Sequence, residues 1–133
     1  MIDIPVRTII HTDLAPEAVG PYSQGVCVDN LIFTAGQIPL DPDTGLLVEG
    51  NFEEQVYRVL RNLAGILSAA GGSLDSVVKF TVYLTDLDSY ATLNDVFERY
   101  FAADPPARSV VQVAALPLGA SVEIEAVALR EGA

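Results

Sequence analysis

The stretch VVKFTVYLT, residues 77–85, alternates apolar and polar side chains from its second residue onward. Successive side chains of a β-strand point to opposite faces of the sheet, so this period of two predicts a strand. The expected buried face consists of Val78, Phe80, Val82 and Leu84, and the opposite face of Lys79, Thr81, Tyr83 and Thr85. A strand with one apolar face needs another layer packed against it.

On both sides of this strand, the apolar residues change to the spacing of a helix. Residues 52–70 repeat them at intervals of three and four, and Gly71-Gly72 can supply the positive φ of a helix C-cap. Asp88 is expected to cap a second helix, which ends at Asp104-Pro105-Pro106. The first apolar stripe is Phe52, Val56, Val59, Leu60, Leu63, Ile66 and Leu67, and the second is Tyr90, Leu93, Phe97, Tyr100 and Phe101.

Shorter strands are expected towards both ends of the chain, over residues 7–11, 25–29, 31–36, 108–113 and 122–130. Asp29-Asn30 predicts a tight turn that joins two of them in a hairpin. With 133 residues and no linker or internal repeat, residues 1–133 are expected to form a single domain. The predicted fold class is α+β, with one mixed six-stranded sheet and two helices on one face.

Two helices cover only one face of such a sheet, so the other face needs a different partner. Its expected apolar residues are Tyr83, Val110, Val127 and Leu129, which are too apolar to stay in water as one patch. Burial against further copies of the chain is the simplest solution, so we predict a closed homo-oligomer. Three polar residues are expected on the same face, near a subunit interface: Arg108, Glu123 and Glu125.

Composition excludes several classes of function. The chain has 18 acidic and 7 basic side chains and a net charge of −11, whereas a nucleic-acid binder needs the opposite balance. The sequence contains neither a signal-peptide pattern nor an apolar run of membrane-spanning length. Cys27 is the only cysteine, so no internal disulfide forms. We expect a cytoplasmic protein with no nucleic-acid and no membrane partner.

The residue inventory also excludes the common catalytic centres. His11 is the only histidine, and it is expected to be structural or on the surface. One histidine and one cysteine cannot form a zinc site, and no phosphate-binding loop is present, so we expect no metal and no cofactor. A carboxylate-only site for a hard cation stays open from the residues, without the spacing of an EF-hand. Cys27 is expected to fill the core. The remaining polar candidates are Tyr22, Thr34, Gln37, Asn94, Arg108, Glu123 and Glu125.

Five blocks of sequence, in order along the chain, carry a family resemblance. They are AVGPYSQG at residues 18–25, TAGQIP at 34–39, VKFTVYL at 78–84, PARS at 106–109 and VEIEA at 122–126. On these blocks the chain resembles the RidA/YjgF family of reactive-intermediate deaminases, part of which has long carried the label endoribonuclease L-PSP.

The resemblance implies a fold, an assembly and a site. The expected fold is similar to that of chorismate mutase, and the expected assembly is a homotrimer with clefts between neighbouring subunits. The resemblance implies two catalytic residues: Arg108 binds the substrate carboxylate, and Glu123 positions water and carries protons. The other expected substrate-binding residues are Tyr22, Thr34, Gly36, Val110 and Asn94.

Two positions depart from the family's usual pattern. Ala35 stands where members often have serine, which removes a hydroxyl that could hold water or substrate. Val110 stands where members often have cysteine. This change excludes a thiol mechanism there but leaves the backbone carbonyl able to accept a hydrogen bond.

The resemblance predicts hydrolysis of 2-imino acids and their enamine tautomers, such as 2-iminopropionate and 2-aminoacrylate, to 2-keto acids and ammonia. Other interpretations stay open from the residues alone. Arg108 and Glu123 could form a plain cross-strand ion pair, Tyr22 could pack in an interface, Gly36 could serve backbone clearance, and Asn94 could occupy an exposed helix position. The alternative functions are a non-catalytic, chaperone-like trimer that binds keto acids and, against the acidic charge, a ribonuclease.

Overall fold

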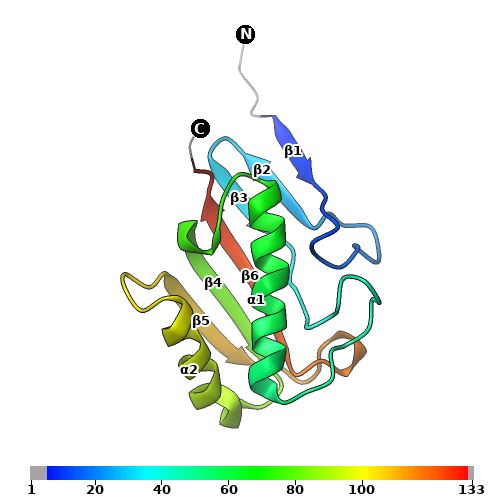
Figure 1. The fold of residues 1–133 in the computed structure, drawn as a ribbon, viewed down its shortest axis with the longest axis vertical. Helices are drawn as coiled ribbons and strands as arrows, with labels where there is room; N and C mark the ends of the chain where they lie inside the picture. The colour runs from blue at the N-terminus through cyan, green and yellow to red at the C-terminus, as the bar shows by residue number, and fades with distance from the viewer. Residues whose placement is uncertain (1–5, 132–133) are drawn as a thin grey trace.

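Residues 6–131 are described by a computed structural model with one mixed sheet and two α-helices on one of its faces (Figure 1). The helices are α1 (Phe52–Ala69) and α2 (Tyr90–Tyr100). The strands are β1 (Arg7–Ile10), β2 (Gly25–Val28), β3 (Leu31–Thr34), β4 (Val77–Leu84), β5 (Ala107–Gln112) and β6 (Val122–Leu129). The predicted fold class is confirmed. Within residues 6–131, neither helix has both the length and the apolar character needed to cross a membrane.

The strand order across the sheet is β1-β2-β3-β6-β4-β5. Neighbouring strands pair antiparallel, except β4 and β5, which are parallel. β6 therefore lies inside the sheet, between β3 and β4, although it is the last strand along the chain (Figure 1).

α1 packs along the middle of the sheet. Its apolar stripe is buried against β3 and β6 as the helical spacing predicts. Asn51 caps the helix, because its Oδ1 accepts a hydrogen bond from the backbone N–H of Glu54 at 2.9 Å. Gly71, with a φ of 87°, ends it as predicted. Both ends of α1 are thus specified locally, and its position comes from burial.

α2 covers the edge of the sheet beside β5 (Figure 1). Phe97 of α2 and Phe101, which follows it, pack on Phe80 of β4 with ring centroids 5.4 and 5.3 Å away. Such tilted and edge-to-face aromatic contacts stabilise beyond their buried area. This cluster fixes α2 above β4 and β5.

The predicted cap of α2 is wrong. Asp88 does not cap the helix; Ser89 occupies the N-cap position and makes no side-chain cap hydrogen bond. A short 3₁₀ turn, Leu87–Ser89, precedes α2 instead, and Asp86 caps that turn by accepting from the N–H of Asp88 at 2.9 Å. The extra turn moves the capping carboxylate two residues towards the N-terminus.

The predicted alternation of β4 fails at one residue. A β-bulge shifts the register between Val77 and Lys79, so Val77 is buried and Val78 is 42% exposed. A bulge adds one residue to a strand and reverses the sides on which the residues before it lie. Beyond the bulge, Phe80, Val82 and Leu84 are buried as predicted.

The face of the sheet without helices, called the open face below, carries several large apolar side chains. Tyr83 and Val127 are half-buried and Leu129 is exposed there, as predicted. Ile9, Phe33 and Val111 add exposed apolar side chains to the same face. A monomer with this surface would leave a contiguous apolar patch in water.

Two residues predicted for the open face lie on the helix-covered face. Val110 pairs with the core residue Val82, so its side chain packs against the core. Val111, not Val110, lies on the open face. Arg108 pairs with Phe80, and its side chain points towards α2. The register between β4 and β5 decides both placements, because paired residues in neighbouring strands share a face.

Candidate active site

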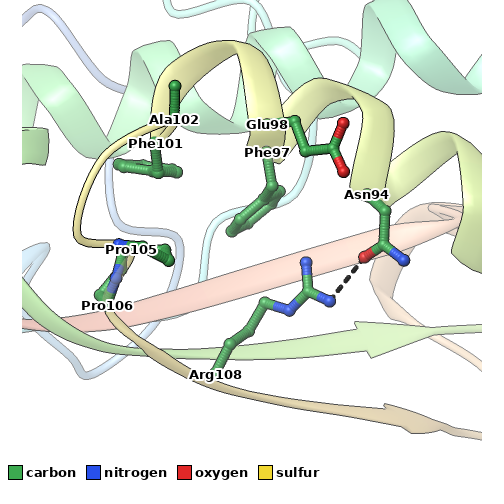
Figure 2. A pocket seen from close by; sticks show the side chains of 8 residues that line it. All are labelled: Asn94, Phe97, Glu98, Phe101, Ala102, Pro105, Pro106 and Arg108. Atoms are coloured by element: carbon green, nitrogen blue, oxygen red, sulfur yellow. Dashed lines mark hydrogen bonds between the residues drawn. The ribbon is translucent and has the colours of Figure 1, made fainter.

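Arg108 extends from β5 beneath α2 (Figure 2). Its Nη2 donates hydrogen bonds to Asn94 Oδ1 at 2.6 Å and to the hydroxyl of Tyr90 at 3.3 Å. The guanidinium carbon lies 5.0 Å from the ring centroid of Phe97 and 5.5 Å from that of Tyr90, within cation–π range. The guanidinium is thus oriented by hydrogen bonds from one nitrogen, Nη2, and by two aromatic rings in contact with it. No acceptor within residues 6–131 binds Nε or Nη1.

A cavity of about 460 Å³ opens beside this guanidinium (Figure 2). Aromatic, alanine and proline side chains form its apolar wall, Arg108 and Asn94 form a polar end, and the acidic side chain of Glu98 also lines it. No carboxylate of residues 6–131 pairs with Arg108, so its positive charge is not neutralised there. An apolar cavity with one fixed cation suits a small organic anion. The remaining lining residues are Phe97, Glu98, Phe101, Ala102, Pro105 and Pro106.

Glu123 lies on β6, on the open face, between the buried residues Val122 and Ile124. Its carboxylate rests against Gly36, where a Cβ atom would come within 2.7 Å of Glu123 Oε2. Gly36 therefore leaves room for the carboxylate, as the backbone-clearance interpretation predicts. Burial, followed by the negative charge of Glu125, raises the pKa of Glu123 above its usual range. A carboxyl group of this kind is suited to proton transfer.

The segment after β3 lies beside Glu123. Thr34 Oγ1 accepts a hydrogen bond from the N–H of Ala126 at 3.0 Å, so this hydroxyl completes the edge of the β3–β6 ladder. Gln37 continues the pairing through backbone bonds to Ile124, of 2.9 and 3.0 Å. The backbone of Gln37 thus extends the pairing with β6, and its side chain is buried.

Tyr22 lies on the loop between β1 and β2 and is 52% exposed. Its hydroxyl accepts a hydrogen bond from the N–H of Val19 at 3.2 Å, which folds the loop back on itself. Gln24 anchors this loop, since its buried amide bonds to the backbone of Thr12 and Pro16. The exposed ring is available to a neighbouring molecule or a ligand.

The structure does not bring Arg108 and Glu123 together within one chain. Their side chains lie on opposite faces of the sheet, and β4 separates β5 from β6. The interpretation as a cross-strand ion pair is therefore wrong. Asn94 is half-buried and binds Arg108, so an exposed helix position is also not observed. A site that uses both charged residues needs two copies of the chain.

Sequence reasoning missed two residues that position the site. Tyr90 binds Arg108, and its spacing of four from Asn94 could have indicated a shared helix face. Asn62 is fully buried in the apolar stripe of α1, where its amide donates to the carbonyls of Ile38 and Leu40. A polar residue inside an apolar stripe was the available signal for this anchor of the segment after Gly36.

His11 and Cys27 have no part in this arrangement. His11 is exposed and lies 3.4 Å from Glu17; together with Asp13 their ligand atoms lie within 4.8 Å of one another on the surface. Cys27 is buried in the core, as predicted.

Comparison with known proteins gives consistent matches. The family model described as endoribonuclease L-PSP matches residues 12–130. The 2-iminobutanoate/2-iminopropanoate deaminase of Bos taurus is 50% identical over 125 residues, covering 94% of this chain and 91% of the relative. The crystal structure of RidA from an Antarctic Psychrobacter superposes with a TM-score of 0.88 at 51% identity and covers 92% of this chain and 98% of its own.

A third match includes a ligand. The crystal structure of Escherichia coli TdcF with bound serine has a TM-score of 0.88 to this chain at 44% identity, and covers 93% of this chain and 99% of its own. All three proteins match over almost their whole length.

Proposed function

Since the chain belongs to the endoribonuclease L-PSP family, which is the RidA/YjgF family, we propose that it is an enzyme that hydrolyses 2-imino acids and their enamine tautomers to 2-keto acids and ammonia. Relatives at 47–50% identity bear the name of 2-iminobutanoate/2-iminopropanoate deaminase. The observation that carries the proposal is the guanidinium of Arg108, which is oriented by Asn94 and two aromatic rings at an apolar cavity.

Arg108 is the proposed anchor of the substrate carboxylate. Its free N–H groups form a fork that matches the two oxygens of a carboxylate, and a charge-assisted contact contributes about 1.5 to 3 kcal/mol. Serine, the ligand of TdcF, has a carboxylate and a nitrogen on C2, as a 2-imino acid does. A structural relative therefore holds a ligand of this size and chemistry.

Glu123 is the proposed proton carrier. The imine carbon is electrophilic, so the carboxylate of Glu123 can take a proton from a water molecule as its oxygen adds to that carbon. The imine nitrogen takes a proton from solvent during this addition, which gives a neutral carbinolamine. Glu123 then returns its proton to that nitrogen, and ammonia leaves as the carbinolamine hydroxyl gives its proton to Glu123 and the carbonyl forms. Water is consumed, a C=N bond is replaced by C=O, and neither a metal ion nor an organic cofactor takes part. The raised pKa of Glu123 supports both halves of this transfer.

A homotrimer is the proposed assembly, with each site between two subunits. Arg108 and Glu123 lie on opposite faces of one sheet, so only Arg108 of one copy and Glu123 of another can address one substrate. The apolar open face supports the same conclusion, because a neighbouring copy would remove it from water. The proposed site also includes Tyr22, Thr34, Gly36, Val110 and Asn94.

We propose the cytoplasm as the location of the reaction and a small molecule, not nucleic acid, as the partner. The net charge of −11 opposes phosphodiester substrates, despite the label endoribonuclease of the family model. Non-catalytic binding of keto acids is the alternative, because Thr34 Oγ1 is occupied and Ala35 adds no hydroxyl beside Glu123.

A trapping assay tests the proposal. An amino-acid oxidase generates 2-iminopropionate in place, and semicarbazide traps the imine that remains. We expect wild-type protein and the control Arg61→Ala, which removes an exposed arginine of α1, to accelerate imine loss, and Arg108→Ala to slow it by about 10- to 150-fold. Identical traces for all proteins and for the blank, also with imines of larger amino acids, would leave ligand binding without turnover as the better description.

A further inference from the structure

The open face carries a second carboxylate beside Glu123. Glu125 lies two residues further along β6, on the same face, because the side chains of a strand alternate. Tyr83 of β4 stands opposite Glu123 in the antiparallel ladder. Its hydroxyl reaches diagonally and donates a hydrogen bond to Glu125 Oε1 at 2.7 Å. One tyrosine therefore faces the first glutamate and fixes the second.

This hydrogen bond holds Glu125 in one place. A carboxylate that is free to rotate on the surface would turn its charge into water, where the high dielectric weakens any effect on a neighbour. Both Glu125 and Tyr83 are half-buried. The hydrogen bond, followed by burial, raises the pKa of Tyr83, so the tyrosine stays a neutral donor. The negative charge of Glu125 therefore stays close to Glu123.

Few other charges face this pair. On β4, Lys79 points to the same face, but its Nζ donates to Ser109 Oγ of β5 at 3.0 Å and forms no ion pair within residues 6–131. From β3 and the segment after it, Thr34 and Gly36 face β6, and neither titrates. The side chains of β5 on this face do not titrate either: Ala107, Ser109 and Val111. Among the charges within residues 6–131 of one subunit, Glu125 is thus the one that acts on the pKa of Glu123, in addition to burial, which raises it most.

The geometry points to Glu125, held by Tyr83, as a positioning residue that keeps Glu123 able to take up and release a proton during imine hydrolysis. The inference rests on the proposed function, because it gives Glu123 the proton transfer. Hydrolysis needs Glu123 first as a base and then as an acid, and one group serves both steps best when its pKa approaches the working pH. A negative charge held nearby raises the pKa of a carboxyl group towards neutral pH, and this needs neither a metal ion nor a histidine.

Glu125→Gln is the main test, since it keeps the shape and the acceptor for Tyr83 but removes the charge. We expect the carboxyl ¹³C signal of Glu123, assigned by its loss in Glu123→Gln, to titrate at lower pH than in the wild-type protein. The acid limb of the pH–rate profile for 2-iminopropionate should move to lower pH too. At neutral pH, kcat should fall roughly three- to tenfold with little change in KM.

Three further variants complete the experiment. Glu125→Asp retains the charge and should restore the titration and the rate towards wild type. Tyr83→Phe removes the hydrogen bond that holds Glu125 and should lower the titration pH of Glu123 by less than Glu125→Gln does. Glu49→Gln removes an exposed charge elsewhere and should change neither readout. Circular dichroism and the oligomeric state show that each variant is folded and assembled.

An unchanged titration of Glu123 in Glu125→Gln overturns the inference, and so does a shifted titration with an unchanged pH–rate profile. Failure of the proposed function gives a different result: the wild-type protein itself does not accelerate imine loss. The titration needs no substrate, so it still reports whether Glu125 acts on Glu123.

Discussion

The two faces of the sheet use their side chains in different ways. On the helix-covered face, β4 and β6 contribute fully buried apolar residues, and the charged exception, Arg108, lies at the β5 edge under α2. On the open face, Glu123 and Glu125 sit among apolar side chains that no helix covers. The covered face therefore stabilises the subunit and orients Arg108, whereas the open face has the roles of assembly and proton transfer in the proposed function. The difference teaches that the two charged residues of the proposed reaction belong to surfaces with different tasks.

The largest expected effect tests the division between stability and assembly. Phe80→Ala removes a fully buried ring that packs on Phe97 and Phe101, so the free energy of unfolding should fall by about 3 to 5 kcal/mol. Phe33→Ala on the open face should lower the free energy of unfolding of the subunit much less and should instead weaken the proposed trimer. Urea unfolding and sedimentation measure the two quantities. Equal losses of subunit stability would remove the distinction between the faces.

The next prediction tests whether one site draws on two copies. Arg108→Ala and Glu123→Gln are each expected to be nearly inactive. When the two variants are refolded together, a site can receive Arg108 from one chain and Glu123 from the other. Random mixing in a closed trimer gives about a quarter of the wild-type activity.

The control for this mixture is each variant refolded alone at the same total concentration. If the mixture is no more active than the separate variants, Arg108 and Glu123 do not meet between subunits.

A smaller effect is expected from loosening the anchor. Asn94→Ala removes the 2.6 Å hydrogen bond to Arg108 but leaves both aromatic rings in place. We expect KM to rise about fivefold, the equivalent of about 1 kcal/mol, with a smaller change in kcat. Initial rates over a range of imine concentrations measure this. Asp95→Ala, which removes an exposed neighbour on the same helix, should leave KM unchanged.

The smallest expected effect concerns stability and pH. Because the pKa of Glu123 is raised by burial and by Glu125, the folded protein holds this proton more tightly than the unfolded chain does. The free energy of unfolding should therefore fall as the pH rises through the pKa of Glu123 in the folded state. Glu123→Gln does not ionise, so its Tm should exceed that of the wild-type protein at pH 8, with the difference shrinking towards pH 4. A constant difference across this range would mean that the carboxyl group gains no proton affinity on folding.

The sequence predicted the elements well because their signals are local. The alternation in residues 79–84, the helical spacing before Gly71 and the turn at Asp29 depend on neighbours within a few residues. The bulge at Val78 was missed because Val77 and Val78 are both apolar, so the sequence does not show which of the two is buried. The cap at Asp86 was missed because Asp86 and Asp88 are equally good acceptors and only the inserted 3₁₀ turn separates them.

The sequence names candidate site residues but does not determine their placement. The motifs PARS and VEIEA indicate Arg108 and Glu123, whereas their faces depend on the pairing of β5 with β4 and of β6 with β4. These pairings join segments far apart in the sequence, and a shift of one residue would reverse them. The contacts of Tyr90 and Asn62 likewise require the tertiary structure.

The position of β6 has a consequence for how the protein is made. A ribosome delivers β1 to β3 first and β4 with β5 later, but no strand pairing joins these two parts of the sheet until β6 enters between β3 and β4. Until then, β3 and β4 each offer an unpaired edge to other nascent chains. Folding that waits for such distant pairing is slow. Ribosome-bound chains that stop before Val122 should therefore depend most on chaperones, and release of this one strand should end that dependence.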